Sequence, residues 1–178
     1  MTPTSHSKTI PMITNLEELY CDQLRDLYSA ETQLITALPE MAVAASNTEL
    51  REGFVAHLEE TREQIVRLEE ICARRGIDPE GEECDAMRGL IKEAKKHMGE
   101  TVTGEVRDAV LIASANRVEH YEIAAYGVAR AFAKALGYDD DAELLSDSLD
   151  EEAATDDALT KIATGGLFGS GVNEAAIH

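Results

Sequence analysis

Apolar residues recur every three or four positions along four long segments of the chain, the spacing expected for one buried face of an α-helix. These segments cover about residues 15–45, 48–74, 105–136 and 140–164. No stretch alternates apolar and polar residues as a half-buried strand does. The pattern therefore predicts an all-α protein built from four long helices.

The connections between these segments differ sharply in length. Ser46, Asn47 and Thr48 form a short, cap-rich turn, and Gly137 ends the third segment just before the fourth begins. A long stretch separates the second and third segments and contains a short amphipathic piece, about 84–98, among the helix breakers Gly76, Pro79, Gly81, Gly99 and Gly104. Two antiparallel hairpins joined by one long crossover predict a ferritin-like four-helix bundle instead of an up-down-up-down bundle.

The two ends of the chain lack this periodicity. Residues 1–14 mix Thr, Ser, His and Pro, and residues 165–178 begin with the glycine-rich string GGLFGSG. Both are predicted to be flexible tails on a single helical domain that spans residues 15–164. A chain of 178 residues is the expected size for one such domain.

Charge narrows the range of functions. The chain has 16 Lys and Arg against 35 Asp and Glu, a formal charge of −19. A surface this negative repels phosphate backbones and anionic lipid, so neither nucleic acid nor a membrane is expected as a partner. The N-terminus lacks the apolar core of a signal peptide, and we expect a cytoplasmic protein. Cys21, Cys72 and Cys84 form no CxxC pair and are interpreted as inert thiols.

Several acidic residues lie on the apolar faces of the predicted helices instead of opposite them. Glu31 interrupts a leucine seam in the first helix, and Glu122 falls at the centre of the apolar face of the third, with Glu119 one turn earlier. On the fourth helix Glu152 is central and Asp156 is near it. The second helix carries His57 on its apolar face, Glu60 on the flank and Gln64 between them. The candidate metal ligands are therefore Glu31, His57, Glu60, Glu119, Glu122, Glu152 and Asp156.

One inward acid is commonly a boundary residue or the partner of an arginine. Five such acids on four helices are harder to explain in that way, because each unpaired buried carboxylate costs several kcal/mol. A pair of divalent cations would neutralise them, since hard and borderline cations take carboxylate oxygen and imidazole nitrogen. Carboxylate-bridged dimetal bundles place one Glu per helix, and a second ligand on two helices, in the same way.

The histidine pattern departs from that arrangement. Glu-x-x-His is expected on two helices, but Glu63 follows Glu60 and Thr155 follows Glu152 at that spacing. His57 is the only inward histidine of this set, and it is interpreted either as a ligand or as a core residue that supports one. His120 is assigned to the surface or to a contact with another subunit.

Four segments resemble the corresponding blocks of the YciE/YciF family of ferritin-like proteins: LYSAETQLITALPEMA, AHLEETREQIVRLEEI, RDAVLIASANRVEHYEIAAYG and LDEEAATDDALTKIA. The strings HLEET, VEHYEIA and EEAATD are the most specific part of a match that covers about residues 15–164. The resemblance implies a ferritin-like bundle, a homodimer and a link to bacterial stress responses. It implies no established reaction.

A dimetal centre would use Glu31 and Glu122 as terminal ligands and Glu60 and Glu152 as bridges, completed by His57, Glu119 and Asp156. Two iron ions, or alternatively manganese, would then couple metal oxidation to the reduction of oxygen or peroxide. Tyr28, Tyr121 and Tyr126 are interpreted either as radical quenchers or as core residues.

Other functions are weighed against this one. A ferritin-like storage cage is disfavoured because GGLFGSG stands where ferritin has a further helix, and a DNA protector is disfavoured because the N-terminal tail offers only Lys8. A non-catalytic helical dimer that acts as a stress-response scaffold or as a metal-binding and storage module stays open as the alternative.

Overall fold

The structure, a computed structural model, describes residues 12–166 and 169–177. This part of the chain contains six helices and no strand: α1 (Leu16–Ala44), α2 (Thr48–Arg75), α3 (Asp85–Glu100), α4 (Glu105–Ala135), α5 (Asp139–Thr164) and α6 (Val172–Ala175). The four long helices predicted from the periodicity are thus confirmed, and their bounds lie within a few residues of the predicted ones.

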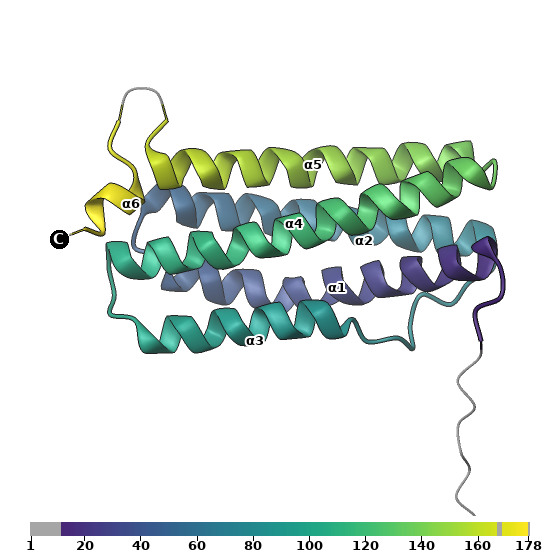
Figure 1. Ribbon diagram of the computed structural model, residues 1–178, viewed down its shortest axis with the longest axis horizontal. Helices are drawn as coiled ribbons and strands as arrows, with labels where there is room; N and C mark the ends of the chain where they lie inside the picture. Colours follow the sequence, from purple (N-terminus) through teal and green to yellow (C-terminus); the bar gives the residue numbers. More distant parts are fainter. Residues whose placement is uncertain (1–11, 167–168, 178) are drawn as a thin grey trace, which may run out of the picture.

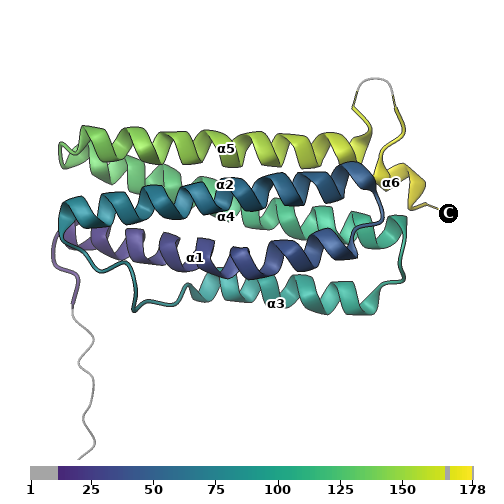
Figure 2. The ribbon, with the colours of Figure 1, turned by 180° about the vertical axis from the view of Figure 1, so that it is seen from behind.

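The long helices form two antiparallel hairpins, α1 with α2 and α4 with α5 (Figure 1). After α2 the chain returns along the bundle through an extended segment and then α3, so that α2 and α4 run in the same direction (Figures 1 and 2). In the bundle α1 packs on α4 and α2 packs on α5. This single long crossover confirms the predicted ferritin-like topology.

Polar side chains define where α1 and α2 begin. Asn15 and Asn47 cap the two helices, accepting hydrogen bonds from the backbone N–H groups of Glu18 and Leu50 at 2.9 and 3.0 Å. The turn between the helices is held by buried Asp108 of α4, whose two carboxylate oxygens each accept one backbone N–H at 2.8 Å, from residues 46 and 47. The first hairpin is therefore tied directly to the start of the second.

Two apolar clusters fill the bundle, one toward each end. One cluster includes Leu34, Leu50 and Leu111, and the other includes Leu24, Ile71 and Leu145. Burial of these aliphatic side chains supplies most of the driving force for the fold, at about 25 cal/mol per Å² of apolar surface. Between the two clusters the interior is polar, and the inward acids lie there.

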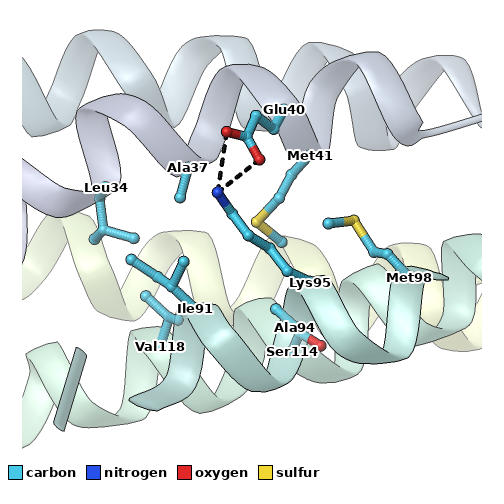
Figure 3. A pocket seen from close by; sticks show the side chains of 10 residues that line it. All are labelled: Leu34, Ala37, Glu40, Met41, Ile91, Ala94, Lys95, Met98, Ser114 and Val118. Carbon is cyan, nitrogen blue, oxygen red and sulfur yellow. Dashed lines mark hydrogen bonds and ion pairs between the residues drawn. The ribbon is translucent and has the colours of Figure 1, made fainter. Parts of the chain in front are cut away.

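The crossover helix α3 covers the seam between α1 and α4 (Figures 1 and 2). Beneath α3 lies a small apolar cavity with a volume of about 10 Å³. Side chains of α1, α3 and α4 line it, including Leu34, Met41, Ile91 and Val118. Figure 3 shows the ion pair between Lys95 and Glu40, with the Lys95 Nζ 2.8 Å from Oε2, beside this cavity. The α1–α4 seam is therefore closed by a packed helix.

The C-terminal segment differs from the flexible tail predicted from its glycines. Val172 begins the short helix α6 and is buried where α6 contacts α4 and α5. Gly165 adopts a left-handed conformation, and a Cβ at Gly165 or Gly171 would collide with the backbone. These glycines permit a close reversal of the chain, so their abundance reflects a tight turn and not an absence of structure.

Residues 1–11 of the predicted N-terminal tail, together with residues 167, 168 and 178, lie outside the described part of the chain. Among the helices that the structure describes, none combines the length and the apolar character needed to cross a membrane.

Candidate metal centre

Five titratable side chains meet halfway along the bundle, between the two apolar clusters. They come from all four long helices: Glu31 from α1, His57 from α2, Glu119 and Glu122 from α4, and Glu152 from α5. Each is at most 2% exposed. The helical spacing that carries apolar residues into the core also carries these five inward, since they occupy positions of the same stripes.

The centre is compact. One ligand atom from each of His57, Glu119, Glu122 and Glu152 can be chosen so that all four atoms lie within 4.8 Å of one another. His57 Nε2 is 3.5 Å from Glu119 Oε1 and 3.9 Å from Glu152 Oε2. Four potential ligands from three helices therefore surround one small volume.

Neutral side chains orient two of the carboxylates. The hydroxyl of Tyr126 donates a hydrogen bond of 2.5 Å to Glu31 Oε1, and Gln64 Nε2 donates one of the same length to Glu152 Oε1. Gln64 also donates to Glu151, which forms a bidentate ion pair with Arg67 at 2.6 Å. Each of the two carboxylates is therefore held through one oxygen, while its other oxygen makes no hydrogen bond to the described residues.

The centre has many polar atoms that make no hydrogen bond within the described structure. They include both nitrogens of His57, both oxygens of Glu122, and one oxygen each of Glu31, Glu119 and Glu152. Buried polar groups in folded proteins nearly always have a partner, and a concentration of exceptions at one point calls for a specific explanation. A cation that accepts these lone pairs is one such explanation.

Burial and mutual repulsion favour the protonated forms of the four carboxyls. Burial, followed by the charge of Glu152, raises the pKa of Glu31 to about 8. Burial likewise raises the pKa of Glu119 to about 8. The pKa values of Glu122 and Glu152 lie well above the ordinary range, again chiefly because of burial. The metal-free centre therefore retains protons that a bound cation would displace.

Burial and the neighbouring carboxylates act in opposite directions on the pKa of His57. Burial lowers its pKa, but the 3.5 Å contact with the Glu60 carboxylate and the charges of Glu152 and Glu31 outweigh burial, and the net shift of the pKa is upward. The same contact with His57 is the largest cause of a lowered pKa at Glu60. His57 and Glu60 thus shift each other's pKa values, which links the buried centre to a carboxylate at its edge.

Two of the seven predicted ligands lie at the periphery. Glu60 is 41% exposed, and its Oε2 is 3.5 Å from His57 Nδ1, on the side of the imidazole away from Glu119. Asp156 accepts a 2.6 Å hydrogen bond from Asn116 and lies 3.5 Å from Nε2 of His120, a largely exposed residue as predicted. Neither Glu60 nor Asp156 belongs to the compact four-residue group.

Two further acids of the described chain are buried, Asp108 and Asp141, and helical spacing did not predict either. Asp141 has no exposed surface and is paired with Arg75 at 2.7 Å, and Asp108 holds the α1–α2 turn. Asp141 is one of three consecutive acids at the start of α5, and Asp108 lies in the first turn of α4. Acids are common at helix starts, so their position concealed that their side chains are buried.

Fold and centre together define a class: a ferritin-like four-helix bundle whose interior holds a cluster of carboxylates and one histidine. The chain belongs to the family described as "Domain of unknown function (DUF892)", whose model matches residues 15–176. This membership agrees with the resemblance seen in the sequence, because protein YciF of Escherichia coli K12 is 44% identical over 161 residues, covering 90% of this chain and 97% of that protein.

Solved structures give the same picture. The crystal structure of the E. coli stress protein YciF has a TM-score of 0.83 at 42% identity and covers 93% of this chain and all of that one. YcfI of Rhodopseudomonas palustris, described as a candidate structural protein, has the same TM-score at 43% identity, covering 88% and 98%. A Xanthomonas campestris protein at 20% identity, with a TM-score of 0.67 and coverage of 83% and 89%, shares the fold.

Proposed function

We propose that this protein binds two divalent metal ions in the bundle interior and couples their oxidation to the reduction of oxygen or peroxide. The observation that carries the proposal is the convergence of His57, Glu119, Glu122 and Glu152 within 4.8 Å, with Glu31 beside them. The four buried carboxylates carry a charge of −4 when ionised, which two divalent cations would balance. Iron is the proposed metal and manganese the alternative, because both accept oxygen-rich donor sets.

The donor set fits such ions. The unpartnered atoms of the centre are carboxylate oxygens and imidazole nitrogens, which are ligands for borderline and hard cations, and the compact group found among the described residues contains no cysteine. Bound iron or manganese would supply the electrons for reducing oxygen or peroxide. We propose Glu119, Glu122, Glu152 and His57 as the principal ligands, with Glu31 as a further carboxylate ligand.

The remaining side chains of the centre have positioning roles in this proposal. Tyr126 holds one oxygen of Glu31, which leaves the second oxygen free for a cation. Gln64 does the same for Glu152, and the Arg67–Glu151 pair fixes Gln64 in turn. Such supporting hydrogen bonds orient ligands and commonly change metal affinity by about 10- to 100-fold.

Metal analysis tests the proposal. We expect about two ions per chain after incubation with Fe(II) or Mn(II), and loss of binding in Glu122→Gln and Glu152→Gln, which keep side-chain shape but remove charge. Glu143→Gln is the matched control because Glu143 lies on the exposed face of α5. Equal metal content in all four proteins would contradict the proposal. Consumption of oxygen or peroxide by the metal-loaded protein then tests the redox step separately.

A second candidate is a non-catalytic helical module that acts as a scaffold or stores metal. The description of R. palustris YcfI as a candidate structural protein favours it, as do the raised pKa values, which allow the buried acids to stay neutral without a metal. Absence of metal from every preparation would support the scaffold, whereas bound metal without turnover would support storage.

We also propose that the protein is a cytoplasmic homodimer that takes part in a stress response. The description of E. coli YciF as a stress protein and the family resemblance support this setting. Light scattering of the purified protein should give twice the mass of the 19.4 kDa chain. A mass of one chain at all concentrations tested would contradict the dimer.

A further inference from the structure

A groove between α2 and α5 leads from the surface toward the candidate metal centre. It encloses about 200 Å³, and its walls contain the small residues Gly53, Ala56, Ala154 and Ala158. Buried His57 and Glu60, which is 41% exposed, also line it. Because His57 is buried and belongs to the four-residue group, the groove reaches the centre itself.

Side chains with ligand atoms follow one another along this path. Glu60 is 41% exposed and its Oε2 accepts a long hydrogen bond of 3.5 Å from Thr155. The same Oε2 is 3.5 Å from His57 Nδ1, and His57 Nε2 is 3.5 Å from Glu119 Oε1. Ligand atoms thus lead stepwise from solvent through Glu60 and His57 to Glu119.

The contacts of Glu60 suit a side chain that changes position. Its two contacts, to His57 and Thr155, are both 3.5 Å, longer than the 2.5 Å hydrogen bonds that fix Glu31 and Glu152. Glutamate has three rotatable bonds, and a loosely held, exposed carboxylate retains much of that freedom. The imidazole of His57, in contrast, is buried and neither of its nitrogens has a hydrogen-bond partner in the described structure.

We infer that the α2–α5 groove is the entry route for divalent cations and that Glu60 is the entry ligand, which takes a cation from solvent and transfers it to the centre beside His57. This inference rests on the proposed metal-binding function and assigns Glu60 a role in the rate of binding instead of a bridging position. A carboxylate at the mouth of a narrow, low-dielectric groove raises the local concentration of cations and therefore the association rate.

The first test measures the rate of Co(II) binding to metal-free protein by stopped-flow absorbance, together with the final Co(II) content per chain. Glu60→Gln keeps the shape of the side chain and removes its charge. We expect an association rate lower by about tenfold, with a weaker dependence on salt and an unchanged final Co(II) content. Glu59→Gln is the control, since Glu59 is an exposed neighbour outside the groove.

Two results for Glu60→Gln would overturn the inference. An unchanged association rate would show that cations do not pass Glu60. Loss of one Co(II) per chain, with an unchanged rate for the remaining ion, would make Glu60 a resident ligand. If the wild-type protein itself binds no Co(II) after prolonged incubation, the proposed metal-binding function fails, and that outcome is distinct from both.

The second test blocks the groove without touching a titratable group. Ala158→Leu places a larger apolar side chain in the groove wall, whereas Ala153→Leu adds the same group at an exposed position of α5 outside the groove. We expect Ala158→Leu to slow Co(II) binding about tenfold while Ala153→Leu leaves the rate unchanged. Circular dichroism verifies that both variants are folded. Equal rates in the two variants would exclude the α2–α5 groove as the entry route.

Discussion

The two inter-hairpin seams of the bundle, α1 with α4 and α2 with α5, have opposite characters. Helix α3 lies over the α1–α4 seam and leaves only a small apolar cavity of about 10 Å³ (Figures 2 and 3). In the described residues no helix covers the middle of the α2–α5 seam, where a groove of about 200 Å³ reaches His57 and Glu60. One seam is closed and apolar, and the other is open and carries ligand atoms.

The difference follows from the topology. A crossover between parallel helices α2 and α4 must travel the length of the bundle, and α3 buries Met87 and Ala94 as it does so. Its apolar face needs an apolar partner, which the α1–α4 seam provides. Since a connection of this length can cover only one such seam, the other is left free for access to the centre.

The largest expected effect is a dependence of the free energy of unfolding on pH. It comes from the titratable groups of the polar centre, because the apolar clusters carry no charge. In the metal-free protein the pKa values of Glu31 and Glu119, about 8, exceed the unfolded value of 4.5. The folded state therefore holds protons that the unfolded chain releases, and the free energy of unfolding should fall by about 3 kcal/mol or more between about pH 5 and pH 8. The raised pKa of His57 acts in the same direction, and the lowered pKa of the half-exposed Glu60 opposes it weakly.

Urea denaturation of metal-free protein across this pH range measures the effect. Glu122→Gln replaces a buried acid by a neutral isostere, and we expect it to be more stable than the wild type near pH 8 without metal. Added Mn(II) should raise the stability of the wild type there more than that of the variant. A flat pH profile in the metal-free wild type would contradict the electrostatic description of the centre.

The next largest expected effect is a loss of stability when a side chain packed in the closed α1–α4 seam is shortened. Leu34 is buried beside the cavity under α3, and Leu34→Ala should lower the free energy of unfolding by about 2–5 kcal/mol, because it enlarges a space that the helices cannot collapse to fill. Val66→Ala, at an exposed position of α2, should change it by about 0.5 kcal/mol or less. Denaturant titration of both variants measures the difference. A loss at Leu34 as small as that at Val66 would mean that α3 is only loosely attached.

The smallest expected effects on the free energy of unfolding come from replacing one serine on each seam by alanine. Ser114 lines the cavity under α3, and its buried hydroxyl has no hydrogen-bond partner among the residues that the structure describes. Ser114→Ala should therefore leave the free energy of unfolding unchanged or raise it by about 1 kcal/mol. Ser148, equally buried, accepts a 3.2 Å hydrogen bond from Arg67 across the α2–α5 seam, and Ser148→Ala should cost about 1 kcal/mol. The same substitution thus has opposite expected signs, and thermal unfolding of the two variants measures both. Equal losses in both would contradict this contrast.

Much of the centre could be predicted from helical spacing. Glu31, Glu119, Glu122 and Glu152 occupy apolar stripes, and a helix of regular geometry carries every residue of a stripe to the same side. The buried position of His57 follows from the same rule. Glu60 lies about 60° from His57 around α2, and this angle alone cannot separate a buried residue from one at the edge of a groove. The neighbouring helix decides that, and here the small residues of α5 leave Glu60 partly exposed.

Helical period and the lengths of the connections predict the helices, their hairpins, the crossover and the inward direction of five titratable residues, because both are local properties of the chain. Local pattern does not reveal which seam α3 covers, which oxygen atoms Tyr126 and Gln64 hold, or that the C-terminal helix α6 packs against the bundle. These features depend on contacts between residues far apart in the chain. Their energies come from burial and from the pairing of polar groups across helices, which no single segment contains.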